Sequence, residues 1–292
     1  MPLPDRETIA RLSAPSLRTW MARVLFDWGC VALLFAILAR WPHPIFFVVG
    51  VILLGSRQHA ISFLGHDAAH FRICRNRWWN DLLGGIFASW PMAVGLGGYR
   101  KFHFLHHATL GTPADPELVQ RAWASPQWDL PRSRWQVGLD ILRDLTGMAA
   151  SDIFCFARLM KPTNRWDLFG PVVWWSVALA LLAWAGMLWI AGLWFFSLIS
   201  AYWAVFRLRM WCEHIGTDST HRVSARWWEK ALYQPHNAWC HYEHHRWPSV
   251  PCWNLPVLRA LETETPVLTT AELWRKLESS PVMANGAVPA QA

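Results

Sequence analysis

Charged residues are scarce in this sequence. Asp, Glu, Lys and Arg make up 16% of the 292 residues, whereas an average soluble domain has roughly 25%. Hydrophobic residues account for 53%, which excludes an intrinsically disordered chain and argues against an ordinary cytosolic enzyme. We therefore expect a membrane protein with a sizeable water-facing part.

Cysteine is also sparse, and its spacing carries no motif. The six cysteines form no Cys-x-x-Cys pair, so neither a thiolate zinc site nor a thioredoxin-like redox motif is predicted.

The N-terminal segment carries acidic residues and prolines ahead of the first apolar run, unlike a cleavable signal peptide. The formal net charge of +7 accompanies apolar runs, so anionic lipid or an acidic protein partner is expected rather than nucleic acid.

Long uncharged runs predict four membrane-spanning helices. Residues 168–206 contain no charged side chain, and as one helix they would be roughly 58 Å long, about twice the hydrocarbon thickness. We expect a hairpin there, with its turn near Gly186 to Gly192. Residues 82–98 are uncharged but rich in glycine, which favours a re-entrant or interfacial segment. The predicted spans are about 20–40, 43–65, 169–188 and 191–211.

The distribution of Lys and Arg predicts the orientation of these spans. Residues 66–168 carry 12 of them and the chain after Cys212 carries 7, whereas the two short connections carry one, Arg40 at the end of the first span, and none. By the positive-inside rule, both termini and the long loop lie in the cytosol. The predicted fold class is an all-α integral membrane protein, multi-pass in a bacterial inner membrane, with a cytosolic helical cap. Its parts are a cytosolic N-terminal segment (1–19), a membrane domain (20–260) and a cytosolic tail (261–292).

Eight of the 13 histidines fall into three tightly spaced groups. Residues three and four apart share a helix face, so each group can aim two or three imidazoles at one point. Neutral imidazole binds Zn, Cu, Fe and Ni, and eight clustered imidazoles match a two-metal site. Zinc is the second interpretation, but a zinc site closes with four ligands. The groups are His66 and His70 in GHDAAH, His103, His106 and His107 in HFLHH, and His241, His244 and His245 in HYEHH.

These three boxes, in this order and separated by a hydrophobic hairpin, resemble the integral-membrane fatty acid desaturase superfamily, which includes hydroxylases and carotenoid ketolases. The resemblance covers about residues 20–260. It is carried by GHDAAHFRICRNRWWNDLLG, HFLHHATLGTPADPE and HNAWCHYEHHRWPSVPCWNLP. It implies a non-haem di-iron centre, bound almost entirely by histidine, which uses O2 as co-substrate to remove hydrogen from an unactivated C–H bond.

The resemblance also implies a further ligand after the last span, which maps to His214 in WCEHIGT. No catalytic residue beyond the metal ligands is predicted. The nine expected ligands are His66, His70, His103, His106, His107, His214, His241, His244 and His245.

Several polar residues near the boxes are candidates to support the ligands by hydrogen bonds to their free ring nitrogens. His221 is open to a plain surface role, and His43, on the far side, is not expected to bind metal. Asn80 and Asp81 are expected to cap a helix. The supporting candidates are His59, Asp67, Asp115, His236, Asn237 and Glu243, with Arg57 as a partner inside the second span.

The function implied by the resemblance is an O2-dependent oxidoreductase acting on a lipid-like chain, free, carrier-bound or in phospholipid. An acyl desaturase that introduces a C=C bond is the first hypothesis. The alternatives are a hydroxylase or ketolase of a fatty acid or carotenoid, an oxidative decarboxylase and, outside this class, a membrane zinc hydrolase or a metal transporter. The sequence contains no cytochrome b5-like haem motif, so a separate ferredoxin, rubredoxin or cytochrome b5-type donor is expected.

Overall fold

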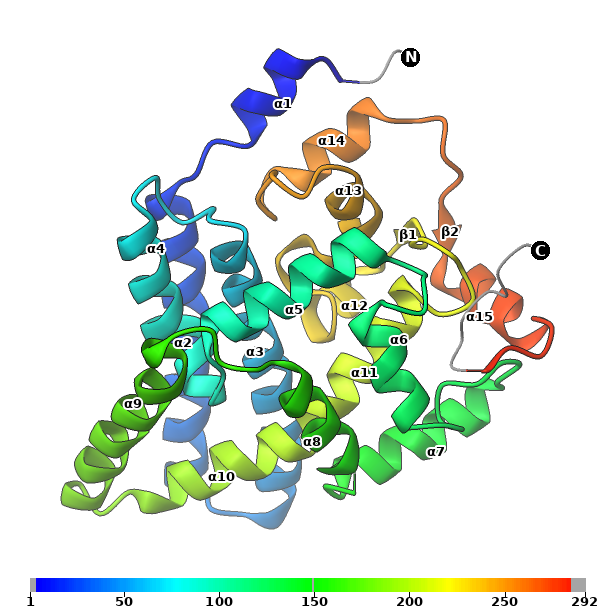
Figure 1. Cartoon of the computed structure of the whole chain (residues 1–292). Coiled ribbons are helices and arrows are strands. Elements are labelled where there is room, and N and C mark those ends of the chain that lie inside the picture. The colour runs from blue at the N-terminus through cyan, green and yellow to red at the C-terminus, as the bar shows by residue number, and fades with distance from the viewer. Residues whose placement is uncertain (1–3, 149, 285–292) are drawn as a thin grey trace.

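The computed structural model describes residues 4–148 and 150–284 and is almost entirely helical (Figure 1). Within these residues, four helices are long and apolar enough to cross a membrane. This confirms the predicted all-α class with four membrane helices. They are α2 (Leu17–Arg40), α3 (Pro44–Ala69), α9 (Arg165–Trp184) and a fourth, Leu188–Glu213, which is made of α10 (Leu188–Ile199) and α11 (Ala201–Glu213).

The ends of these helices are determined by capping groups rather than by the limits of the apolar runs. Ser16 accepts a hydrogen bond from the Thr19 N–H and starts α2 ahead of the predicted residue 20. Asn164 caps α9 in the same way, so this helix begins at Arg165 rather than near 169. The turn after α9 is short, and Gly186 has the left-handed φ of 68° that glycine adopts without strain.

The fourth membrane helix is broken at Ser200, whose φ of −120° and ψ of −87° are not helical. Helix α3 passes close to this break. A Cβ atom on Gly55 would lie 2.5 Å from the backbone of both Ala201 and Tyr202, closer than real Cβ contacts. The absence of a side chain at Gly55 therefore allows α3 and α11, which both lead to the histidine site, to pack directly together.

Residues 77–109 form a bent pair of helices. Helix α4 (Arg77–Gly84) continues through a π-helical turn, η1 (Gly85–Ser89), and a 3-10 turn, η2 (Trp90–Met92), and α5 (Leu96–Thr109) then leaves at 88° to it. Such a pair is either a broken span or a re-entrant loop, and the latter is the expectation drawn above for residues 82–98.

The predicted cap at Asn80 and Asp81 is wrong. Asn76 caps α4 by accepting from the Trp79 N–H. Asn80 is buried inside that helix, where its side chain accepts from the Ile73 N–H and donates to the Ala68 carbonyl. Asp81 instead forms an ion pair with Arg100. Asn80 thus fastens α4 to the end of α3, which is a tertiary role that local capping rules do not reveal.

The remaining elements are short. Some gather at one end of the membrane helices, and others lie beside the fourth one. In Figure 1, α1, α13 and α14 lie at the upper end, and the connectors 41–43 and 185–187 lie at the lower end. β1 and β2 pair in parallel over two residues each. These elements are α1 (Arg6–Leu12), α6 (Pro116–Trp123), α7 (Arg134–Leu145), α8 (Ala150–Leu159), β1 (Val223–Ser224), α12 (Trp227–Leu232), η3 (Pro235–Cys240), α13 (His241–Arg246), α14 (Leu255–Leu261), β2 (Leu268–Thr269) and α15 (Thr270–Glu278).

Tryptophans fill two different environments. Trp28 stacks on Trp194 at a ring separation of 5.5 Å, and their indole N–H groups donate to backbone carbonyls of the η1–η2 segment. These two rings therefore hold the bent segment against α2 and α10. Trp184, by contrast, is 89% exposed at the end of α9, where an indole suits a membrane interface.

Candidate metal centre

The structure brings all nine predicted histidines together in two adjoining sets. Within each set the candidate ligand atoms lie within 4.8 Å of one another. Seven of the nine side chains are buried. The first set contains His66, His70, His103, His107 and His244, and the second contains His106, His214, His241 and His245.

Two helices contribute to both sets. On α5, His103 and His107 are one turn apart and face the first set, while His106 faces the second. On α13, His244 belongs to the first set and His241 to the second. Consecutive helical residues point about 100° apart, so each H-x-x-H-H box places neighbouring imidazoles in different sets and joins the two sets.

The geometry of the first set fits a cation better than a hydrogen-bond network. The His103 Nε2 atom lies 2.9 Å from the Nε2 atoms of both His70 and His107. A neutral imidazole nitrogen either donates or accepts one hydrogen bond in its ring plane, so both contacts cannot be satisfied by hydrogen bonds from this atom alone. An ion between the converging nitrogens would satisfy all of them, which is the arrangement expected of metal ligands.

The second set shows the same convergence. The His241 Nε2 atom lies 2.7 Å from that of His214 and 3.0 Å from that of His245. The Nε2 atom of His106 is buried and has no hydrogen-bond partner among the described residues. Burial lowers the pKa of His241, His244 and His245. These imidazoles are therefore neutral near pH 7, which is the form that binds metal.

In three of the four histidines of the second set, Nδ1 lies beside an oxygen atom. Nδ1 of His106 lies 2.9 Å from Oδ1 of Asp115, which is one of the supporting candidates. Nδ1 of His214 donates to the Ser219 carbonyl at 3.1 Å, and Nδ1 of His241 lies 3.4 Å from Glu213 Oε1. Such contacts orient imidazole ligands and select the tautomer that leaves Nε2 for the metal. The sequence analysis missed Glu213, whose signal was its position directly before His214.

Five other supporting candidates make different contacts from those predicted. Asp67 accepts from the Cys252 N–H, Asn237 donates to the Cys252 carbonyl, and Glu243 pairs with Arg222. Residues adjacent to a ligand in sequence point to other faces of the helix and so fasten the cap instead. The other two are His236, which pairs with Asp27 at 2.6 Å beside the Asp27–Arg57 ion pair, and His59, which packs against the rings of Tyr202 and Phe206 outside both sets.

The two histidines given no ligand role lie apart from both sets. His43 caps α3 at the connector end. His221 is buried rather than on the surface, because its Nε2 atom pairs with the Ile215 carbonyl at 2.7 Å. Burial lowers the pKa of His221 to about 4, so it is a neutral structural group.

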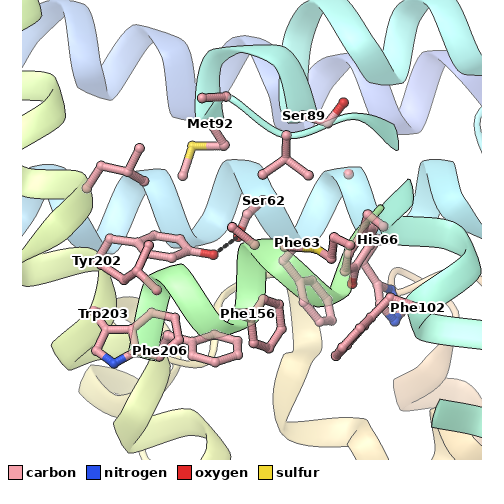
Figure 2. Close-up of a pocket in the computed structure, with 18 of the residues that line it drawn as sticks. Ser62, Phe63, His66, Ser89, Met92, Phe102, Phe156, Tyr202, Trp203 and Phe206 are labelled. Carbon is pink, nitrogen blue, oxygen red and sulfur yellow. Dashed lines mark hydrogen bonds between the residues drawn. The ribbon is translucent and has the colours of Figure 1, made fainter. Parts of the chain in front are cut away.

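An apolar cavity of about 340 Å³ borders the histidines. His66, His103 and His241 contribute to its lining. Figure 2 shows His66 at one end, near Phe102, and Tyr202 and Trp203 at the other. Helix α8 closes one side through residues such as Phe156, a contribution that no sequence motif indicated. The cavity thus forms an apolar space that borders histidines of both sets.

Comparison with known proteins agrees with this geometry. The chain is 26% identical over 262 aligned residues to the dihydrorhizobitoxine desaturase of Bradyrhizobium elkanii, with 77% of this chain and 69% of that protein covered. It is 23% identical to the sn-1 acyl-lipid omega-3 desaturase (ferredoxin) of a Nostoc species, with 86% and 77% covered. It is 25% identical to the beta-carotene 4-ketolase of Protosiphon botryoides, with 80% and 56% covered.

A family model described as fatty acid desaturase matches residues 40–274. This range includes all three histidine boxes, His214 and the whole cavity lining. The chain therefore belongs to the fatty acid desaturase family of oxidoreductases.

Proposed function

We propose that this protein is an O2-dependent di-iron desaturase that introduces a C=C bond into an acyl chain. The observation that carries the proposal is the convergence of nine histidines beside an apolar cavity that three of them line. In the overall reaction, –CH2–CH2– and O2 take up two electrons and two protons to give –CH=CH– and two water molecules. O2 is thus the oxidant, and an external electron donor supplies the two electrons.

The nine histidines would hold two iron ions, one in each set. The bound ions would supply the O2 activation and hydrogen abstraction that the reaction requires. The residues around them hold the ligands in place: Asp115 keeps the Nε2 atom of His106 free for the metal, and Glu213 does the same for His241. A carboxylate or carbonyl oxygen at the far nitrogen also makes the imidazole a stronger donor.

The cavity residues would bind and position the substrate. Their aromatic and aliphatic side chains offer no hydrogen bond to water over most of the lining, which favours an alkyl chain and excludes solvent from the reacting carbon. The Tyr202 hydroxyl, which points toward α3, donates to Ser62 Oγ at 3.4 Å (Figure 2). Removal of hydrogen at one carbon depends on accurate placement, and the rigid α3, α5 and α11 provide it.

The distribution of charge supports an orientation of the protein in the membrane, and similarity to other desaturases supports a type of electron donor. We infer that the end of the membrane helices that carries the histidines faces the cytosol, because Lys and Arg are concentrated in the segments at that end. A separate ferredoxin is the favoured electron donor, since one of the similar desaturases is named as ferredoxin-dependent.

A second candidate is hydroxylation or ketolation of a lipid or carotenoid. It is favoured by one observation, the similarity to a beta-carotene 4-ketolase over 80% of this chain. The same histidine sets would serve this reaction, and the difference would arise from how the substrate carbon lies in the cavity.

The decisive experiment is expression of the chain in a bacterial host followed by gas chromatography–mass spectrometry of its lipids. A new unsaturated acyl chain, absent with His106→Ala, is expected. A new hydroxyl or keto product would favour the second candidate. Metal analysis of the purified protein should show about two iron ions per chain, and a single zinc with no oxidised product would contradict both.

A further inference from the structure

We propose that the apolar cavity opens sideways into the membrane between α8 and α10, and that its substrate is an acyl chain of a membrane phospholipid. This inference rests on the proposed function and deepens it, since it names the form in which the acyl chain is presented. The proposal is carried by the residues at the mouth of the cavity, the outer faces of α7 and α8, and the cations beside them.

The cavity is open on one side, and the exposed part of its lining is apolar. Four of the lining residues are exposed, namely Ala93, Ala157, Phe195 and Ile199. Phe195 and Ile199 lie on the exposed face of α10, which begins one turn earlier at Gly192. Because α10 is the first half of a membrane span, this face meets hydrocarbon. The mouth of the cavity therefore faces the acyl chains of the bilayer.

Helix α8 forms a wall between the cavity and the exterior. Ile153, Phe156 and Ala157 lie three and four residues apart and line the cavity (Figure 2). The Phe156 ring packs against Phe102 of α5 at a centroid separation of 4.8 Å. Phe154, on the other face of α8, is 67% exposed. A helix with apolar side chains on both faces suits a position between an apolar cavity and lipid.

The outer face of α7 extends this apolar surface. Trp135, Leu139 and Leu142 lie three or four residues apart on α7 and are between 46% and 74% exposed. The turn after α7 reaches α10, since a Cβ atom on Gly147 would lie 3.7 Å from Cδ1 of Ile199. The exposed face of α7 thus adjoins a membrane span, and a contiguous apolar surface in that position is typical of a helix lying in the membrane interface.

Buried ion pairs hold α7 and α8 in this orientation. Arg207 of α11 is fully buried and pairs with Asp144 near the end of α7. It also pairs with Asp152 at the start of α8, at 3.0 Å. Both helices are therefore fastened to a membrane span through their inner faces, which leaves their outer faces free to contact lipid.

Three exposed cations lie where the head group of such a lipid would be. Arg158 is near the end of α8, Lys161 is in the connection that follows, and Arg165 is the first residue of α9. Because α9 is a membrane span, its first residue marks the level of the head groups, where Lys and Arg bind phosphate. A phospholipid with its chain between α8 and α10 would keep its phosphate beside these cations.

The test uses the full-length protein in vesicles of phosphatidylcholine and phosphatidylglycerol that contain a phospholipid with a diazirine in one acyl chain. Illumination followed by peptide mass spectrometry should find label on Phe156 and Met160, which line the cavity. A free fatty acid with the same diazirine, added to identical vesicles, is the second probe and should label these residues less.

Ala157→Trp should lower cavity labelling by the phospholipid at least about tenfold, because the indole would fill the mouth. Leu181→Trp changes an exposed position of α9 outside the cavity lining and should label as wild type does. Equal cavity labelling in Ala157→Trp and wild type would overturn the opening between α8 and α10. Stronger labelling by the fatty acid than by the phospholipid would overturn the assigned substrate. If α7 and α8 stay unlabelled on their outer faces and the protein is a dimer, that surface is an interface between copies and the proposal is wrong.

This labelling requires no bound iron, so its failure and the failure of the proposed function are distinguishable. Cavity labelling by a protein that makes no unsaturated lipid in the expression host would leave the opening standing and overturn the desaturase. If Ala157→Trp aggregates, Ile199→Trp supplies the second variant from the opposite side of the mouth, with the same expected loss of labelling.

Discussion

Oδ1 of Asp115 lies 2.9 Å from Nδ1 of His106, and both groups are almost fully buried. The contact fixes the imidazole tautomer with its proton on Nδ1, so the Nε2 atom is left with its lone pair directed into the second set. A group nine residues away in sequence thereby controls a candidate ligand.

Replacing Asp115 by Ala should weaken iron binding in the second set by about 10- to 100-fold, because His106 loses its orienting partner. Asp115 also caps α6, and a lost cap alone costs about 1 kcal/mol. Asn164→Ala removes the cap of α9 without touching the histidines and is the matched control. Chelator competition measures the effect, and equal iron retention in the two variants would contradict the orienting role.

Replacing His244 or His214 by Ala should eliminate product and lower the iron content. His244→Ala removes a candidate ligand of the first set, and His214→Ala removes one of the second. His43→Ala, at the connector end of α3, should retain both. Product analysis and metal analysis of the membrane-inserted proteins check this. Near-normal turnover in His244→Ala would argue against the di-iron assignment.

Replacing Gly55 by Ala should lower the thermal stability of the protein in detergent and its iron content together. The new methyl group would lie 2.5 Å from the backbone of α11, and overpacking of this kind typically costs about 1–3 kcal/mol. The same change at Gly29 on α2, where no atom lies within 4 Å of the added Cβ, should be harmless. An unaltered unfolding midpoint in Gly55→Ala would show that the helices can separate freely.

Replacing Trp203 by Leu should extend the cavity at the end away from His66 (Figure 2), and longer acyl chains should then be accepted. Trp184→Leu changes an exposed indole outside the cavity and should leave chain-length preference as it is. Competition between acyl chains of different lengths, followed by gas chromatography, reports the change. An identical product distribution in both variants would show that Trp203 does not limit chain length.

A reporter fused to the C-terminus should be active only in the cytosol, because the 12 Lys and Arg residues of 66–168 outweigh Arg40 at the connector end of α2. A reporter inserted at connector 185–187 should read as extracytoplasmic. Reversed signals from the two positions would place the histidine sets on the other side of the membrane.

The sequence by itself determined the four apolar helices and the membership of the three histidine boxes, since both depend on local periodicity and on the length of an uncharged run. Only the tertiary structure decided that the adjacent His106 and His107 belong to different sets. It also showed that Asp115 and Glu213, rather than Asp67 and Glu243, support the imidazoles. The physical reason is that a helix directs neighbouring residues to different faces, and the partner on each face comes from a segment far away in the chain. The cavity depends in the same way on α8 and α11 packing beside α3 and α5, which no local pattern specifies.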